Sequence, residues 1–289
     1  MQPKTTNVWK IMWSEIYSDK VALIGLILFF LIIGTVYIWA MFLDQTEVMF
    51  VNLRLRNLPP SGEFWLGTDS GGRDMLRHLI LSARNSFNIA FLVTAGGAAI
   101  GILVGLIAGY FGGHVDNVIM RVINLVAMVP FIMLIVVFVS LVPSYSAVTF
   151  AGIMILFSWQ GTAVLLRIKA LQQGRLDYVS ASKTLGTPNF VIIFREVLPN
   201  LVSIIVSNLT LALANNIGIE TGLTFLGFGL PFDTPSLGRL VVYARTPANL
   251  TDRPWLWLPA ALLIVIMMLC VNFVGQALNR AADAKKRTI

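Results

Sequence analysis

The sequence predicts an all-α integral membrane protein with six transmembrane helices. Of the 289 residues, 57% are hydrophobic and 12% are charged, and the mean hydropathy is +0.80. A water-soluble domain does not bury that much apolar surface in one core. Lipid offers the backbone no hydrogen-bond partners, so each span should be helical. Six mostly apolar stretches approach the length of about 20 residues that crosses a bilayer; they are Val21–Leu43, Ile89–Tyr110, Val122–Leu141, Ala147–Leu166, Leu198–Ile217 and Trp257–Gly275.

Residues 1–20 precede the first span, 21–43, and are expected to form a cytoplasmic helix in the membrane interface. One helical stripe contains Val8, Trp9, Met12, Trp13 and Ile16, and tryptophan favours the level of the lipid headgroups. A frayed cytoplasmic tail is the alternative. Because no small-residue cleavage site follows, the first span is read as an anchor and not as a removed signal peptide.

The lysines set the expected orientation. All seven fall before the first span, between the fourth and fifth spans, or after the sixth; they are Lys4, Lys10, Lys20, Lys169, Lys183, Lys285 and Lys286. Positive charge concentrates on the cytoplasmic side of membrane proteins. We therefore expect cytoplasmic termini, a cytoplasmic loop at 167–197, external loops at 44–88 and 218–256, and a five-helix core within 89–289.

The formal net charge of +7 does not indicate nucleic-acid binding, because the cations flank apolar spans and form no basic face with interleaved aromatics. The lipid bilayer is the expected environment instead. The one cysteine, Cys270, lies within the sixth span and can form no internal disulfide.

The second span carries glycine at every fourth position. Gly97, Gly101, Gly105 and Gly109 share one helical face, where a second helix can approach closely because no side chain intervenes. This pattern predicts helix packing and does not by itself identify a substrate site. In the third span, Asn117, Arg121, Asn124 and Met128 form a stripe, and Pro130 predicts a kink after it.

The fifth span is interrupted by amides and hydroxyls. Unpaired amides are costly in hydrocarbon, so these groups should face other helices or a water-filled path. The candidates for lining a path are Ser203, Ser207, Asn208, Thr210 and Asn215. Ordinary hydrogen bonding between helices is an equally weighted alternative.

The cytoplasmic loop reads RIKALQQGRLDYVSASKTLGTPNFVIIFREVLPN. Asp177 to Leu185 can form a short helix with an acidic residue near its positively polarised start. Gly186 supplies a turn at its end, and Pro199 suits the beginning of the next span. A short surface helix braced by two spans is suited to transmitting motion from a cytoplasmic partner.

This loop resembles the signature of the inner-membrane subunits of ABC importers, which runs Glu-Ala-Ala, three residues, Gly, nine residues, Ile, one residue and Leu-Pro. Gly186, Leu198 and Pro199 match it, and Ala181 matches the central alanine. Ser180 and Ser182 stand where the signature has Glu and Ala, and Glu196 stands where it has Ile. The resemblance assigns contact with the ATPase to the following residues: Asp177, Tyr178, Ser180, Ala181, Ser182, Leu185, Gly186, Leu198 and Pro199.

Four further stretches look like successive signatures of the dipeptide and oligopeptide permease branch, in that branch's order. They are FWLGTDSGGRDMLRHLILSARNSF (64–87), GYFGGHVDNVIMR (109–121), DYVSASKTLGTPNFVIIFREVLPN (177–200) and ETGLTFLGFGLPFDTPSLG (220–238). Together they cover nearly the whole chain after residue 60. The chain most resembles the C-type partner of the two paired permeases.

The resemblance implies a type I ABC importer transmembrane fold in a bacterial cytoplasmic (inner) membrane. It also implies a second, B-type permease, two ATP-binding subunits that bind ATP and Mg, an external peptide-binding protein and a path between the two permeases. Glu220 to Gly238 is expected to contact the binding protein or close the path, with Glu220, Phe225 and Phe232 as outer-gate candidates. A structural cap is the alternative for this element.

The chain itself is expected to be no enzyme and to bind no cofactor or metal. No lysine follows a glycine, so there is no phosphate-binding loop. His78 and His114, expected in loops, lack a second ligand at helical metal spacing. An importer of nickel or another small solute in the same family is the nearest alternative. A secondary transporter is a weaker alternative, because it would need a membrane-buried acid and Glu220 is expected just beyond the fifth span. A membrane enzyme is also weaker, because no span carries a nucleophile–base arrangement and the sequence has no HExxH motif.

Overall fold

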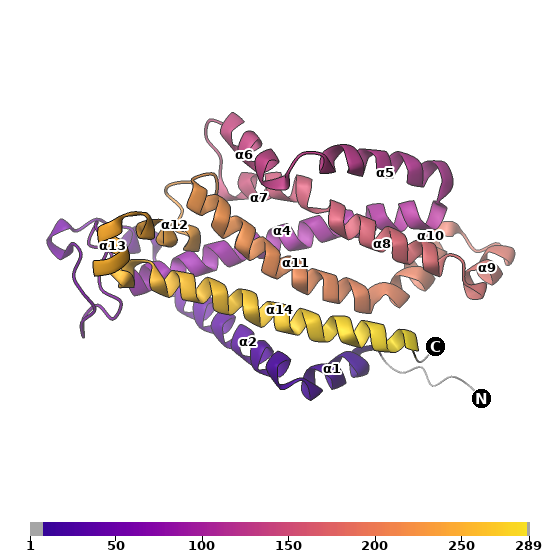
Figure 1. The fold of residues 1–289 in the computed structure, drawn as a ribbon, viewed down its shortest axis with the longest axis horizontal. Helices are drawn as coiled ribbons and strands as arrows, with labels where there is room; N and C mark the ends of the chain where they lie inside the picture. The colour runs from indigo at the N-terminus through magenta and orange to yellow at the C-terminus, as the bar shows by residue number, and fades with distance from the viewer. Residues whose placement is uncertain (1–7, 288–289) are drawn as a thin grey trace.

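The computed structural model describes residues 8–287, and their side chains from residue 12 to residue 282. This part of the chain is helical and contains no β-strand, only an isolated bridge between Thr68 and Asp74. The all-α class is confirmed. Figure 1 shows long helices lying side by side along the molecule.

The helices are α1 (Val8–Ser18), α2 (Lys20–Ala40), α3 (Gln45–Val48), α4 (Met75–Phe111), α5 (Gly113–Ala127), α6 (Phe131–Leu141), α7 (Ala147–Ser158), α8 (Gln160–Gln173), α9 (Asp177–Thr184), α10 (Asn189–Ile192), α11 (Leu198–Leu226), α12 (Leu237–Val242), α13 (Pro247–Asp252) and α14 (Leu258–Arg287). A π-helical turn, η2 (Ile193–Val197), joins α10 to α11, and short 3-10 turns lie at η1 (Leu53–Leu55), η3 (Tyr243–Arg245) and η4 (Pro254–Leu256).

Within the described residues, five helical segments are long and apolar enough to cross a membrane: Lys20–Ala40, Met75–Phe111, Ala147–Gln173, Asn189–Leu226 and Leu258–Ala282. The helices α5 and α6, which are bent by 75° at the break between them, give a sixth span if the pair counts as one broken span. The sequence predicted a kink at Pro130, and the structure has a full break there. Proline lacks the N–H that a helix needs and disfavours helical geometry at the preceding residue.

Several helices are longer than the apolar stretches indicated, and the spans formed by α4 and α11 show the reason. The helix of the second span, α4, begins at Met75 and not at Ile89. The helix of the fifth span, α11, continues beyond Ile217 to Leu226. Asp74 caps the start of α4, where its carboxylate accepts hydrogen bonds from two backbone N–H groups. Charged and polar residues end an apolar window but do not end a helix. The external loops expected at 44–88 and 218–256 are therefore shorter than the sequence indicated.

The glycine face of α4 packs against α7 and α8. A Cβ added to Gly101 would lie 2.7 Å from the Trp159 carbonyl oxygen, and one added to Gly105 would lie 2.5 Å from the Ala163 carbonyl oxygen. Gly109 abuts the Arg167 carbonyl oxygen in the same way, and Gly97 abuts the Ser158 hydroxyl. Glycine is needed here because the two helix backbones leave no room for a side chain.

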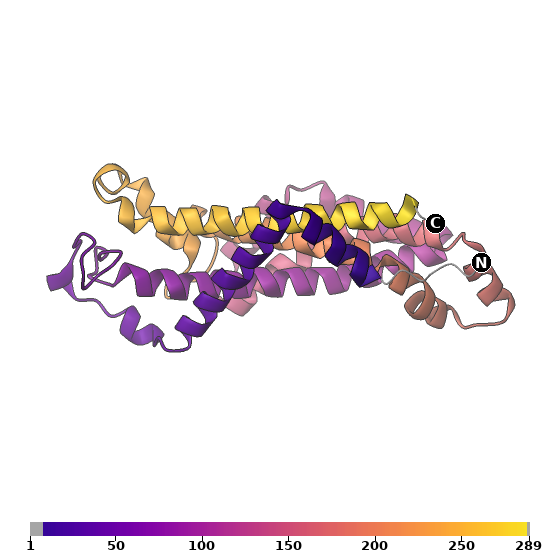
Figure 2. The same ribbon diagram turned by 90° about the horizontal axis from the view of Figure 1, so that it is seen from below.

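The N-terminal part of the chain packs on the last helix. Met12 and Ile16 of α1 are buried beside Ala277 of α14, while Trp13 and Tyr17 remain exposed; the side chains of Val8 and Trp9 lie outside those the structure describes. Figure 2 shows α2 crossing obliquely between α14 and α4.

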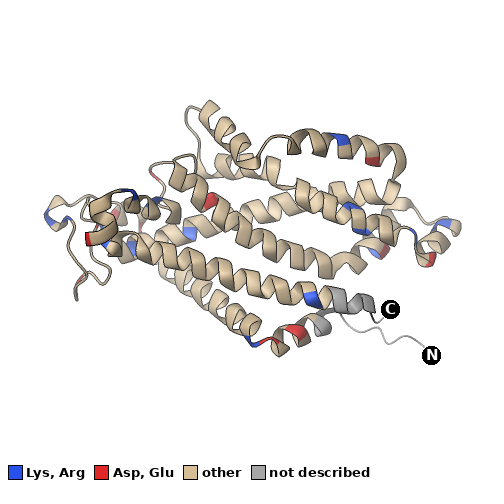
Figure 3. Ribbon diagram, in the orientation of Figure 1, with Lys and Arg blue, Asp and Glu red and all other residues tan. Residues whose placement is uncertain are grey.

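Charged residues gather mainly at the two ends of the molecule (Figure 3). One end carries α9 and the C-terminal part of α14 and is called the α9 end below. The other carries α12 and α13 and is called the α12 end. The uncharged middle is the part suited to a hydrocarbon layer.

Candidate functional site

The helix expected in the 167–197 loop is α9, and its end has a defined backbone geometry. Gly186 has a φ of +81°, in the left-handed region. Its N–H donates to the Lys183 carbonyl at 3.0 Å, and the Thr187 N–H donates to the Ser182 carbonyl at 3.0 Å. These two bonds make the Schellman arrangement, which satisfies carbonyls at a helix end.

One apolar side chain fastens α9 to the spans. Val179 is fully buried in a cluster with Leu106 of α4, Leu166 of α8 and Val197 of η2. The other side of the loop is apolar and uncovered, since Leu185 is 84% exposed and Phe190 64% exposed. Exposed apolar residues at a charged, membrane-distal end are typical of a protein interaction surface.

Polar contacts brace α9 from a second direction. The Ser182 hydroxyl contacts both carboxylate oxygens of Glu196, at 2.8 and 2.9 Å. Ser182 and Glu196 are two of the positions at which the loop departs from the ABC signature, and the structure brings them together. Nearby, the Lys183 ammonium lies 4.6 Å from the centre of the Tyr110 ring on α4, a favourable cation–π distance.

The remaining loop residues divide into exposed and braced positions. Asp177, Ser180 and Ala181 are exposed. The Tyr178 hydroxyl donates to Gln173 at 2.8 Å, and burial raises the pKa of that hydroxyl. Leu198 begins α11, and its N–H bonds to the Ile193 carbonyl across the π turn. Pro199 follows, where its missing N–H leaves one donor fewer to satisfy.

The polar residues of α11 face three directions. Ser203 and Ser207 are buried, and the Ser207 hydroxyl donates to the Gly275 carbonyl of α14 at 3.3 Å. The Thr210 hydroxyl bonds within its own helix, to Val206 at 2.8 Å. The side-chain amide oxygen of Asn208 accepts from the Thr162 hydroxyl of α8 at 3.0 Å. Ser207 and Asn208 therefore make the interhelical bonds that were the alternative to a path.

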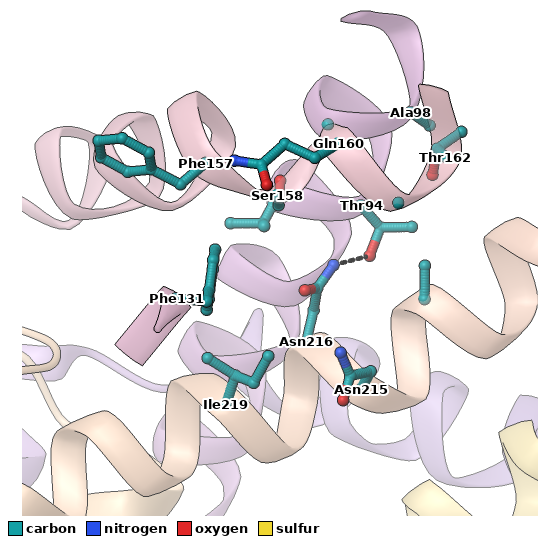
Figure 4. Close-up of a pocket in the computed structure, with 14 residues that line it drawn as sticks. Thr94, Ala98, Phe131, Phe157, Ser158, Gln160, Thr162, Asn215, Asn216 and Ile219 are labelled. Carbon is teal, nitrogen blue, oxygen red and sulfur yellow. Dashed lines mark hydrogen bonds between the residues drawn. The ribbon is translucent and has the colours of Figure 1, made fainter. Parts of the chain in front are cut away.

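Asn215 instead borders a pocket with a volume of about 250 Å³ between α4, α6, the α7–α8 junction and α11 (Figure 4). Five other polar groups line it, and they are Thr94, Ser158, Gln160, Thr162 and Asn216; of these the sequence marked only Asn216, as one of the amides that interrupt the fifth span. They come from three segments far apart in the chain, and an isolated threonine or glutamine in an apolar span gives no signal that they meet. We call these five residues and Asn215 the amide pocket.

Glu220 corrects a prediction. It lies within α11, not beyond its outer end, and it is fully buried. Its carboxylate accepts hydrogen bonds from the hydroxyls of Thr224 at 3.0 Å and Thr221 at 3.4 Å, and Ser86 of α4 also bonds to it. A buried carboxylate is retained only where such donors compensate for lost water.

The same hydroxyls fasten the segment between α11 and α12, residues 227–236, which we call the outer loop. The Thr224 oxygen accepts from the Leu230 N–H at 3.2 Å, and the Ser86 oxygen accepts from the Leu237 N–H at 3.1 Å. The hydroxyls that hold the two ends of the outer loop therefore also bond to Glu220.

The tip of the outer loop projects outward. Phe232 is 83% exposed, and the Arg239 guanidinium lies 4.4 Å from the centre of its ring. Phe225 is covered in a similar way by Arg245 at 4.4 Å. Among the three outer-gate candidates, Phe232 is thus a surface residue, Phe225 a stacked one and Glu220 an internal support.

The GTDSGGRD motif builds a second fixed structure at the α12 end. Asp69 is fully buried and accepts from the N–H groups of Gly71 and Arg73, at 2.8 and 2.9 Å. The Tyr243 hydroxyl donates to it at 2.9 Å, and burial together with Asp69 raises the pKa of that hydroxyl. This motif holds the segment before α4 against η3.

The broken span α5–α6 is the least covered part of the bundle. Asp116 forms a bidentate ion pair with Arg167 of α8, which ties the start of α5 to the bundle. Beyond that pair, Asn117, Arg121 and Asn124 are exposed. An exposed polar face on a membrane-length segment points to a water-filled path or a second protein.

No metal centre is found among residues 8–287, because no group of three or more His, Cys, Asp or Glu side chains converges in the part described. The histidines also differ from expectation, since neither lies in a loop. His78 is buried in α4, and His114 is exposed in the first turn of α5.

Comparison with known proteins gives one family. Residues 101–288 match the model of the binding-protein-dependent transport system inner membrane component. The chain is 46% identical over 275 residues to the oligopeptide transport system permease protein OppC of Lactococcus lactis subsp. lactis, covering 95% of this chain and 94% of the relative. It is 33% identical over 284 residues to AmiD, the oligopeptide permease of Streptococcus pneumoniae, covering 96% of this chain and 90% of that protein. It is 32% identical over 277 residues to the dipeptide permease DppC of Bacillus subtilis, covering 95% and 85%. The chain therefore belongs to the family of binding-protein-dependent transport system inner membrane components.

Proposed function

We propose that this chain is the C-type permease subunit of an ATP-driven importer for di- and oligopeptides. Family membership and the functions by which the relatives are named support the transport class and the substrate class. The observation that carries the coupling role is that Val179 fixes α9 to the spans while Leu185, at the end of α9, and Phe190, in α10, are exposed to a partner.

The proposed complex contains a second, B-type permease, two ATP-binding subunits that hold ATP and Mg, and an external peptide-binding protein. The exposed polar face of α5 supports a path shared with a second permease, because this chain leaves that face uncovered. Closure of the ATPase pair would push on α9. The push would pass through Val179 to α4 and α8, and through the Ser182–Glu196 contact to η2 and α11.

The proposed setting is a bacterial cytoplasmic membrane with the α9 end in the cytoplasm. The lysine distribution and the position of α9 at the same end of the molecule as the C-terminal part of α14 support this orientation (Figure 1). Cysteines placed singly at Asn57 and Lys183 test it with a membrane-impermeant thiol reagent. Position 57 should label only from outside and position 183 only from the cytoplasm, and the reverse result would overturn the orientation.

At the α12 end, the outer loop is proposed to contact the binding protein through Phe232. Its many backbone anchors support a preformed surface, since a rigid exposed aromatic side chain loses little entropy when it binds. Photocrosslinking from position 232 to the binding protein tests this contact. Absence of crosslinks at 232 and at its neighbours would favour a structural cap.

An importer of nickel remains the nearest alternative substrate assignment. The amide pocket favours peptides, because its polar lining consists of amides and hydroxyls, whereas nickel prefers imidazole ligands. The deciding experiment is reconstitution of the complete complex with copurified partners. ATP-dependent uptake of labelled dipeptide, with no uptake of nickel, is expected. Uptake of nickel alone would refute the peptide assignment.

A further inference from the structure

The break between α5 and α6 borders the amide pocket. This break places Phe131 on the pocket wall, and Ser158 and Gln160 lie there on either side of Trp159, within the span Ala147–Gln173. Interrupted helices persist at membrane depth only where protein or a water-filled cavity surrounds them. In transporters, such interruptions commonly form substrate sites.

The hydrogen-bonding capacity of the pocket follows from its internal contacts. The Thr94 hydroxyl donates to the Ala90 carbonyl at 2.7 Å, so its oxygen acts as an acceptor, and the Asn216 amide nitrogen donates to it at 2.9 Å. This contact directs the amide oxygen of Asn216 away from Thr94 as an available acceptor (Figure 4). The side-chain amides of Asn215 and Gln160 make no hydrogen bond with the rest of the described chain. Both amides can therefore donate and accept.

The pocket also carries no charge. Its 14 lining residues include no Asp, Glu, Lys, Arg or His. Neutral amides match the C=O and N–H groups of a peptide bond and favour neither sign of side-chain charge. The volume of about 250 Å³ lies below the range of about 300–1,000 Å³ for sites that enclose a whole small ligand. A pocket of this volume suits a segment of a longer peptide substrate.

We propose that the amide pocket binds the peptide groups of a substrate in transit, and that its neutrality lets cationic and anionic peptides pass with similar efficiency. Asn216, Asn215 and Gln160 supply the hydrogen bonds. This inference rests on the proposed importer function and assigns substrate contacts to it.

The test introduces a negative charge without changing side-chain shape. Asn215→Asp, and independently Gln160→Glu on the facing wall, are reconstituted in the complete complex. Uptake is measured for trialanine and for its analogues with a central lysine or a central glutamate. The ratio of kcat/KM for the lysine peptide to that for the glutamate peptide should rise about tenfold or more in both variants, because a charge in a water-poor site acts strongly on a nearby charge.

Asn88→Asp is the matched control. It is an identical change on α4 outside the pocket, and the carboxylate can still accept the Tyr37 hydroxyl hydrogen bond seen at 2.6 Å. Its ratio should match that of the unsubstituted complex. If Asn215→Asp does not insert, Gln160→Glu on another helix decides the question. An unchanged ratio with continued uptake overturns the pocket proposal alone, while absence of uptake of all three peptides by the unsubstituted complex overturns the importer function itself.

Discussion

Replacement of Gly186 by valine tests the role of α9 most directly. The φ of +81° places this residue in the left-handed region, where an L side chain costs about 1–2 kcal/mol and a β-branched one more. A Cβ added there would meet no atom within 4 Å. The whole cost is therefore backbone strain, and no steric clash contributes.

The chain can relieve that strain by unwinding the last turn of α9. Unwinding breaks the bonds from Gly186 to Lys183 and from Thr187 to Ser182, each worth about 0.5–1.5 kcal/mol net. Ser182 is also the residue that contacts Glu196, so unwinding of α9 would disturb that contact too. Since about 1.4 kcal/mol is a factor of ten in an equilibrium constant, the equilibrium constant for docking of α9 should fall about tenfold.

The assay is peptide-stimulated ATP hydrolysis and peptide uptake by the reconstituted complex. Gly186→Val should reduce both about tenfold while insertion and the partner content stay normal. Gly186→Asn should stay near the original rates, because asparagine tolerates the left-handed region, and Gly186→Ala should lie between them. Cys270→Ala, in the buried middle of α14, should change neither rate.

Two results would refute the reasoning. Normal transport by Gly186→Val complexes with normal ATPase content would show that α9 does not transmit the movement of the ATPase pair. Equal damage by alanine, asparagine and valine would show that the loss comes from a side chain at this surface and not from backbone strain.

Three further changes test other parts of the structure. Ser182→Ala and Glu196→Ala should each lower uptake severalfold, and the double variant should be no worse than either single one, because both remove the same contact. Gly105→Leu should lower the melting temperature in detergent by several degrees, since its Cβ alone would lie 2.5 Å from the Ala163 carbonyl; a normal melting temperature would contradict the tight α4–α8 contact. Glu220→Leu should leave the Thr224 hydroxyl without its acceptor and make the outer loop more accessible to proteases, whereas Glu220→Gln should largely preserve protection.

The sequence predicted the helical class and the approximate spans because bilayer thickness imposes a length of apolar residues that can be read directly. It misplaced the ends of α4 and α11 for the same reason, since hydropathy marks the lipid boundary and not the end of the hydrogen-bonded helix. Glu220 was placed outside its span because a charge was taken to end it. Its supporting donors include Ser86, which is distant in the chain and invisible to any local pattern.

The loop shows how far local reasoning extends. Gly186 and Pro199 impose their backbone geometry through their own chemistry, so their positions at helix boundaries follow from residue type. The contact between Ser182 and Glu196 depends on how α9 folds back on η2. In the sequence, Ser182 and Glu196 were two separate departures from the signature, and only the fold shows that they are in contact.

The location of these features on one helix has a mechanical consequence. α11 has 29 residues, a length of roughly 43 Å at 1.5 Å per residue. Its first turn adjoins the π turn braced by Ser182 and Glu196, its middle carries Asn215 and Asn216, and its last turns carry Glu220 below the outer loop. A displacement of α9 therefore acts on the same rigid element that lines the pocket and anchors the outer loop. Opening at the α12 end and rearrangement of the pocket should accordingly occur together, because α11 has no break within the described span that would let them move separately.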